Sequence, residues 1–217
     1  MRSFLKMLAR LVYPDRCVLC HGPLHREETD ICRTCRTEIE LCPPMRKRIP
    51  HVAQWSAVWY YRDTVRESLL RCKFAHAKTY CAVYARFMAL KVPQELGEFD
   101  ILTWVPVSSR RKRIRGYDQS ELLAQALGRE LNCQPVRLLR KVRDNPPQSS
   151  LLEASQRKAN VLGVYQTVSP GTFAGKRVLL LDDIITTGST ASEAARVLLT
   201  AGAKEVQCAA VAAAEKP

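Results

Sequence analysis

The chain has 217 residues, enough for one ordinary domain and a small appendage. Its hydrophobic fraction of 47% and charged fraction of 25% are those of a soluble globular protein. No apolar run approaches the ~20 residues that are needed to cross a bilayer, which argues against a membrane-spanning protein.

The formal net charge is +13, and the excess is unevenly distributed. Residues 101–160 hold twelve Lys and Arg against five Asp and Glu, whereas residues 161–217 hold five of each. Segregated positive charge favours a polyanionic partner, such as nucleic acid or a phosphorylated ligand. The alternative is a solvated basic surface that only keeps the protein in solution.

The amino terminus, MRSFLKMLARLVYPDRC, has the apolar spacing of a helix, with Leu5, Leu8 and Val12 on one face. Lys6 and Arg10 interrupt any signal-peptide core, and no small-residue cleavage site follows. We expect a helix that packs on its own protein. The alternative is a basic helix that rests on a membrane surface.

Nine cysteines follow along the chain, an odd number that argues against a disulfide framework. Four of them form two CxxC pairs: Cys17, Cys20, Cys32 and Cys35. Two such pairs predict a tetrahedral zinc site, which is structural because four thiolates leave no open position for water. The alternatives are a redox pair, a loop of free thiols, or a site in which His21 or His25 replaces one cysteine.

The chain then divides into three parts. Residues 1–42 hold the amino-terminal helix and the zinc finger, residues 43–54 form a linker rich in Pro and basic residues, and residues 55–217 form the main domain. Apolar patterns in the main domain predict strands at Ser56–Tyr61, Ile101–Val105, Val136–Val142, Val178–Leu181 and Val206–Ala213. They predict helices at Arg62–Lys73, Thr79–Lys91, Gln119–Leu131, Glu153–Asn160 and Ser189–Ala201. This alternation predicts an α/β fold with a parallel sheet.

The segment VLLLDDIITTGST, residues 178–190, predicts a ligand site at the end of a strand. The strand brings Asp182 and Asp183 to the carboxyl edge of the sheet, where ligands of α/β proteins bind. The loop that follows opens a helix, and its backbone N–H groups and the helix dipole suit a phosphate. The loop residues are Thr186, Thr187, Gly188, Ser189 and Thr190. With sugar hydroxyls at the acids, directly or through a metal, this layout suits a ribose 5-phosphate.

A second anion-binding segment follows the strand that ends at Pro106. Its charged residues are Arg110, Arg111, Lys112, Arg113 and Arg115, and Tyr117 comes two positions later. These side chains either clamp a pyrophosphate or follow a nucleic-acid backbone, with Tyr117 as a stacking surface. The alternative is a solvated mobile loop.

The segment 178–190 resembles the phosphoribosyl pyrophosphate (PRPP) signature of type I phosphoribosyltransferases. Most of residues 17–190 resembles the ComF family, whose members join an amino-terminal zinc finger to a phosphoribosyltransferase-like domain. That resemblance rests on the finger, on VPVSSRRKRIRGYDQSELLA (105–124) and on NPPQSSLLEASQRKANVLGVY (145–165). The family's RGFNQS motif has Asn where this chain has Asp118, which adds a negative charge inside the basic segment.

The resemblance implies a type I phosphoribosyltransferase-like domain that binds PRPP with magnesium, and a cytoplasmic protein that handles imported single-stranded DNA in natural transformation or DNA utilisation. The implied partners are single-stranded DNA, the DNA-uptake helicase and the proteins that receive the strand, with peripheral contact at the inner face of the membrane. The alternative function is an active phosphoribosyltransferase that transfers ribose 5-phosphate to a base or nucleotide. The tail 207–217 shows no segment that selects a base, which favours the accessory role.

Overall fold

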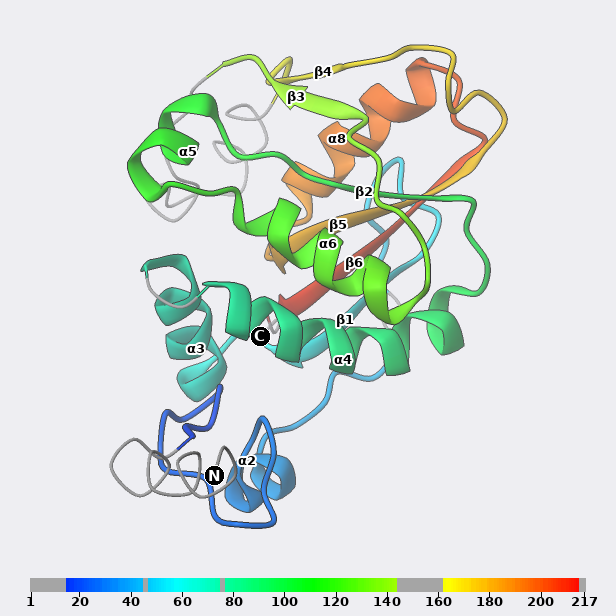
Figure 1. Cartoon of the computed structure of the whole chain (residues 1–217). Helices are drawn as coiled ribbons and strands as arrows, with labels where there is room; N and C mark the ends of the chain where they lie inside the picture. Colours follow the sequence, from blue (N-terminus) through cyan, green and yellow to red (C-terminus); the bar gives the residue numbers. More distant parts are fainter. Residues whose placement is uncertain (1–14, 45–46, 75–76, 144–161, 215–217) are drawn as a thin grey trace.

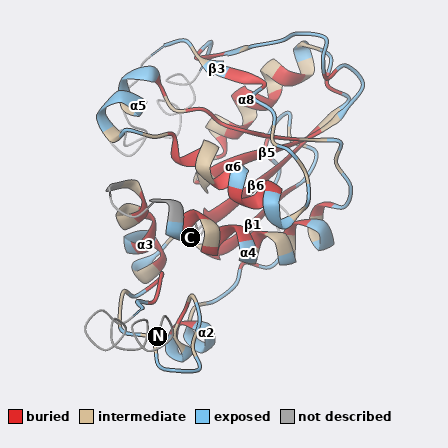
Figure 2. Ribbon diagram, in the orientation of Figure 1, coloured by how far each residue is buried: buried red, intermediate tan, exposed pale blue. Residues whose placement is uncertain are grey.

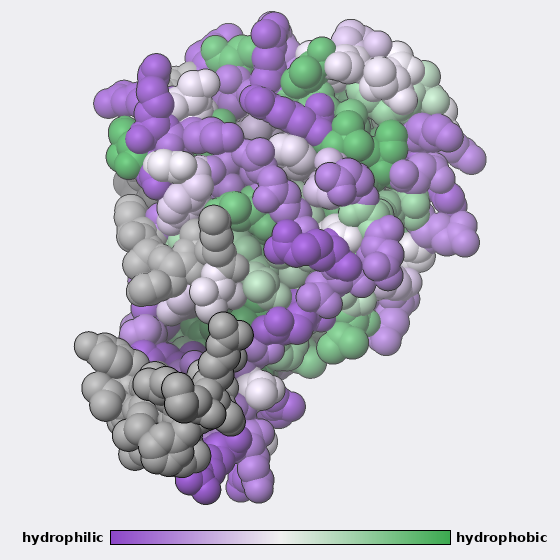
Figure 3. Space-filling view, in the orientation of Figure 1, coloured by the Kyte–Doolittle hydropathy of each residue, from purple (hydrophilic) through white to green (hydrophobic). Residues whose placement is uncertain are grey.

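A computed structural model describes residues 15–44, 47–74, 77–143 and 162–214 of the chain. The predicted helices at the amino terminus and at Glu153–Asn160, and the segment 145–161 of the family resemblance, lie outside the described residues. No helix among those ranges is both long and apolar enough to span a bilayer. The face drawn in Figure 3 is mostly hydrophilic, with hydrophobic residues in small separate groups.

A four-stranded parallel sheet forms the centre of the main domain (Figure 1). Its order is β1 (Trp55–Tyr60), β6 (Glu205–Ala213), β5 (Arg177–Ile185), β2 (Ile101–Trp104). The two central strands are buried almost throughout, as expected for apolar strands that are covered on both faces. The predicted parallel α/β fold is confirmed.

Helices cover both faces of this sheet, and the buried residues lie between the layers (Figure 2). On one face lie α3 (Asp63–Phe74), α4 (Ala77–Leu96) and α6 (Gln119–Glu130), which share one hydrophobic cluster with alternate residues of β5 and β6. On the other face lies α8 (Ser189–Thr200), beside a small antiparallel ribbon of β3 (Leu139–Lys141) and β4 (Tyr165–Thr167).

Two elements run further than their sequence patterns predict. Helix α4 continues through Pro93 to Leu96, where the buried side chains of Val92 and Leu96 hold its last turns against the core. Strand β5 continues past Leu181 to Ile185, because its ladder with β6 persists as far as the pair Ile185 and Ala213. The chain therefore turns after the two acids and not at them.

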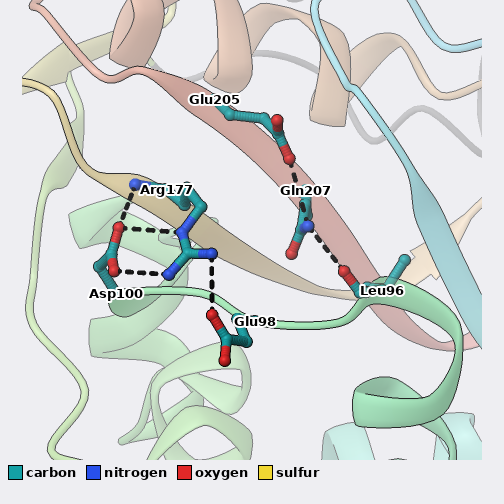
Figure 4. A network of polar contacts seen from close by, with 6 residues as sticks. All are labelled: Leu96, Glu98, Asp100, Arg177, Glu205 and Gln207. Atoms are coloured by element: carbon teal, nitrogen blue, oxygen red, sulfur yellow. Dashed lines mark hydrogen bonds and ion pairs between the residues drawn. The ribbon is translucent and has the colours of Figure 1, made fainter.

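The amino ends of the strands are tied together by polar contacts (Figure 4). Arg177, at the start of β5, donates to Asp100 from its backbone N–H at 2.7 Å and from its guanidinium at 3.0 and 3.3 Å. The amide of Gln207 in β6 donates to the carbonyl of Leu96 at 2.8 Å. These contacts fix where β2, β5 and β6 begin, and so align their carboxyl ends at the opposite edge.

The cysteine-bearing segment packs directly on α3, and its short helix α2 (Arg33–Glu38) carries Cys35. Val18 and Leu19 are buried in the same cluster as the main core. The hydroxyl of Ser68 donates to the carbonyl of Val18 at 2.6 Å, and Arg71 donates to the carbonyl of Leu19. Part of the cysteine-bearing segment is therefore packed into the main core.

The described part of the predicted linker is also packed against the domain. Ile49 is buried, and the indole N–H of Trp55 donates to the carbonyl of Lys47 at 2.6 Å. Ala53 and Gln54 extend the pairing of β1 with β6 through backbone bonds to Val206 and Cys208.

Candidate functional site

Four cysteines converge into one cluster on the finger. The sulfurs of Cys17, Cys20, Cys32 and Cys35 all lie within 4.8 Å of one another. The sulfurs of Cys20 and Cys32 are 3.7 Å apart, and a tetrahedron with metal–sulfur bonds of about 2.3 Å places its sulfurs about 3.8 Å apart. This cluster could hold a metal ion.

Backbone N–H groups around the cluster point at its sulfurs. Gly22 donates to Cys20 at 3.4 Å, Cys32 to Cys17 at 3.3 Å, and Cys35 to Cys32 at 3.4 Å. Such donors stabilise thiolate over thiol. His21 lies elsewhere, with its Nδ1 3.4 Å from the hydroxyl of Tyr80. The donor set therefore consists of four cysteines.

At the carboxyl half of β5, the two acids differ in their surroundings. Asp182 is buried, and one of its oxygens accepts the backbone N–H of Asp183 at 2.8 Å. Asp183 is partly open, with its side chain 20% exposed, and its carboxylate lies 2.9 Å from the ammonium of Lys73 on α3. The acids therefore form one protected and one accessible carboxyl group.

Their pKa values separate for the same reason. Burial raises the pKa of Asp182 well above its usual value, and the negative charge of Asp183 raises it further. Burial also acts to raise the pKa of Asp183, but the ammonium of Lys73 outweighs it and the pKa falls below the usual value. The pair thus favours a proton on Asp182 and a charge on Asp183.

The turn after β5 opens helix α8. Gly188 is the N-cap in the left-handed conformation, with φ of 80°, and no side chain caps the helix. The hydroxyls of Thr187 and Ser189 lie 2.8 Å apart, and the backbone N–H of Ser189 donates to Thr187 at 3.3 Å. The structure places Thr186 and Thr190 half-buried on the same turn. The predicted loop residues are therefore gathered at one helix N-terminus.

The basic segment forms a helix, α5 (Ser109–Arg115), and not a loop. Ser108 caps its start by accepting the N–H of Arg111 at 3.3 Å, and Gly116 ends it in the left-handed conformation. Lys112 pairs with Glu121 of α6 at 2.8 Å. The helix buries none of its own residues, so its charges face either solvent or the neighbouring site.

The arginines of α5 lie on two faces. Arg110 and Arg113, three positions apart, are exposed. Arg111 and Arg115, four positions apart, are half-buried. The charge of Arg115 acts to lower the pKa of Lys73. Burial and the charges of Asp182 and Asp183 raise the pKa of Tyr165, and the charge of Arg111 acts to lower it. The second pair is therefore the more buried of the two, and its charges are felt by groups beside the carboxyl half of β5.

Tyr117 and Asp118 connect this helix to the rest of the domain. The hydroxyl of Tyr117 reaches the carbonyls of Cys72 and Lys73 at 3.0 and 2.9 Å, while its ring stays half-buried. Asp118 is buried and accepts the backbone N–H groups of Val107 at 3.1 Å and Glu121 at 3.2 Å. Both carboxylate oxygens are used, which the amide of an Asn could not match.

Lys73 is the residue of this site that the sequence pattern did not identify. It belongs to the last turn of a predicted amphipathic helix, where a basic residue is ordinary. Only the packing of α3 beside β5 brings its ammonium to Asp183.

Known proteins resemble most of this chain, and residues 118–217 match the phosphoribosyl transferase domain family. The chain is 30% identical to the DNA utilization protein YhgH of Escherichia coli (strain K12), across 91% of this chain and 96% of that protein. It is 27% identical to Competence protein F of Haemophilus influenzae, across 88% of this chain and 94% of that protein. It is 28% identical to Competence protein ComFC of Bacillus subtilis (strain 168), across 88% of this chain and 82% of that protein.

Proposed function

The chain belongs to the ComF family, and we propose that it is a DNA-uptake accessory protein that binds both PRPP and single-stranded DNA. The relatives are named for DNA utilization and competence, which supports a role in handling incoming DNA. The matched domain family supports a phosphosugar as the small ligand. DNA-uptake machinery at the inner face of the membrane is the proposed setting, with a helicase and strand-receiving proteins as partners.

The observation that carries PRPP binding is the juxtaposition of Asp183 with the turn at Gly188. A partly open, charged carboxylate can accept hydrogen bonds from the ribose hydroxyls. Five residues later, Gly188 opens α8, whose N-terminal N–H groups and hydroxyls suit the 5-phosphate. The charges of Arg111 and Arg115 are felt by groups beside the carboxyl half of β5 and suit the pyrophosphate.

Two metal ions fit the residues present. Zinc fits the four-cysteine cluster, where it would supply folding energy and no chemistry, because the thiolates fill all four positions. Magnesium fits the open, charged carboxylate of Asp183, where it would neutralise part of the charge of bound PRPP.

The experiment for PRPP binding is calorimetry on the parent and on the double variant Asp182→Asn plus Asp183→Asn. The Asp183 carboxylate can accept hydrogen bonds from two ribose hydroxyls, and charge-assisted hydrogen bonds contribute about 1.5–3 kcal/mol each, so losing both weakens binding by about a hundredfold or more. The matched control is Asp100→Asn, which removes a paired carboxylate at the opposite edge of the sheet. Equal affinity of the parent and the double variant would contradict the assignment.

A second candidate function is transfer of ribose 5-phosphate to a base or nucleotide, which the domain match favours. The protein would be incubated with PRPP and a panel of bases, with and without single-stranded DNA, and pyrophosphate would be measured. Base-dependent release of pyrophosphate would establish the enzyme. No release with any base would leave PRPP as a bound ligand.

A further inference from the structure

The last turn of α3 is fixed from two sides. On the finger side, Ser68 and Arg71 donate to the carbonyls of Val18 and Leu19. On the side of the basic helix, the hydroxyl of Tyr117 binds the carbonyls of Cys72 and Lys73. The backbone from which the Lys73 side chain extends is therefore held in place.

The Lys73 side chain then makes one close ion pair at the site. Its ammonium lies 2.9 Å from the Asp183 carboxylate, and each side chain is 20% exposed. Exposed ion pairs contribute little, but a pair largely removed from water fixes both partners. Because some of its surface is open, the Asp183 carboxylate has oxygen positions left for a ligand.

We propose that Lys73 is a positioning residue of the phosphosugar site, which orients the Asp183 carboxylate to accept a ribose hydroxyl. The inference rests on the proposed PRPP binding and adds a residue outside the sequence segments that predicted the site.

The groups around Asp183 show what would follow from the loss of Lys73. Asp183 lies among Asp182 on its own strand, Lys73 and Cys72 on α3, and Tyr165 on β4. The pKa of Lys73 is also raised by Tyr61, which follows β1, and lowered by the charge of Arg115 on α5. Without the ammonium, the Asp183 carboxylate would lose the 2.9 Å contact that holds its orientation.

The test is PRPP calorimetry on the parent, Lys73→Met and Lys73→Arg. We expect Lys73→Met to bind about tenfold more weakly. Lys73→Arg keeps the ion pair and should restore most of the affinity. In an Asp183→Asn background, Lys73→Met should weaken binding little further, because the carboxylate that Lys73 orients is already lost.

The matched control is Arg62→Met, which removes an ion pair with Glu40 from an arginine just before α3. It should leave PRPP affinity unchanged. Lys73→Gln replaces Lys73→Met if the latter fails to fold, as judged by its circular dichroism. A Lys73→Met variant that equals the parent, or that weakens binding equally with and without the Asp183 carboxylate, overturns the proposal. A parent that binds no PRPP overturns the proposed function itself.

Discussion

Gly188 carries two separate constraints in one residue. Its φ of 80° lies in the left-handed region, which L side chains rarely adopt. A Cβ at this position would also lie 2.9 Å from Cγ1 of Ile49. The space beside Gly188 is therefore already filled by Ile49, in the segment before β1.

We expect Gly188→Ala to lower the free energy of unfolding by about 1–2 kcal/mol through backbone strain, with a further loss from the contact. Gly171→Ala is the matched control, because its φ is 92° but nothing lies within 4 Å of its Cβ. Urea unfolding measures the free energy of unfolding of both variants. A Gly188→Ala variant no less stable than Gly171→Ala would show that the Ile49 contact is relieved at no cost.

At the scale of elements, α5 separates two uses of one basic segment. We expect Arg110→Gln plus Arg113→Gln to weaken single-stranded DNA binding while leaving PRPP affinity unchanged, because these side chains are exposed. We expect Arg111→Gln plus Arg115→Gln to weaken PRPP binding, because the charges of these side chains are felt by groups beside the carboxyl half of β5.

The salt dependence of DNA binding measures the first effect. Each phosphate of a single strand contributes about −0.7 to the slope of log K against log salt. The exposed pair should therefore account for up to about 1.4 units of slope. If each double variant weakened the binding of PRPP and of single-stranded DNA equally, the helix would have a single anion-binding face.

The elements show which features local patterns could predict. Apolar runs predicted the central strands, and the CxxC spacing predicted the cysteine cluster, because both signals are local. Helix α5 was predicted as a segment of charge and not as a helix, although Ser108 and Gly116 are ordinary start and stop residues. The contact between Lys73 and Asp183 could not be predicted, because it depends on how α3 packs beside β5.

At the scale of the whole molecule, the cysteine cluster and the core form one unit. Cys17, Val18 and Leu19 belong to the cluster that also contains Leu179 and Leu181 of β5. Loss of a metal from the finger would therefore loosen the packing on α3, whose last turn carries Lys73.

We expect one tightly held zinc per chain, measured by elemental analysis. Cys20→Ser removes an exposed cysteine of the cluster, so its effect reports the metal and not packing. It should release the zinc and lower the melting temperature by at least about 5 °C. Cys133→Ser, at a half-buried cysteine outside the cluster, should retain the zinc and the melting temperature of the parent. A structural zinc would be contradicted if the parent protein contained no zinc and Cys20→Ser had the same melting temperature as the parent.

Two separate anion-binding surfaces on one chain are tested most directly by adding saturating PRPP to a complex of the protein with labelled single-stranded DNA. Fluorescence anisotropy would follow the DNA, and calorimetry on the same complex would follow PRPP. We expect PRPP to bind while the DNA stays bound, with its Kd changed by no more than about threefold, because salt screens charges on separate surfaces. Release of the DNA in proportion to the PRPP added would show one shared surface and contradict the proposal.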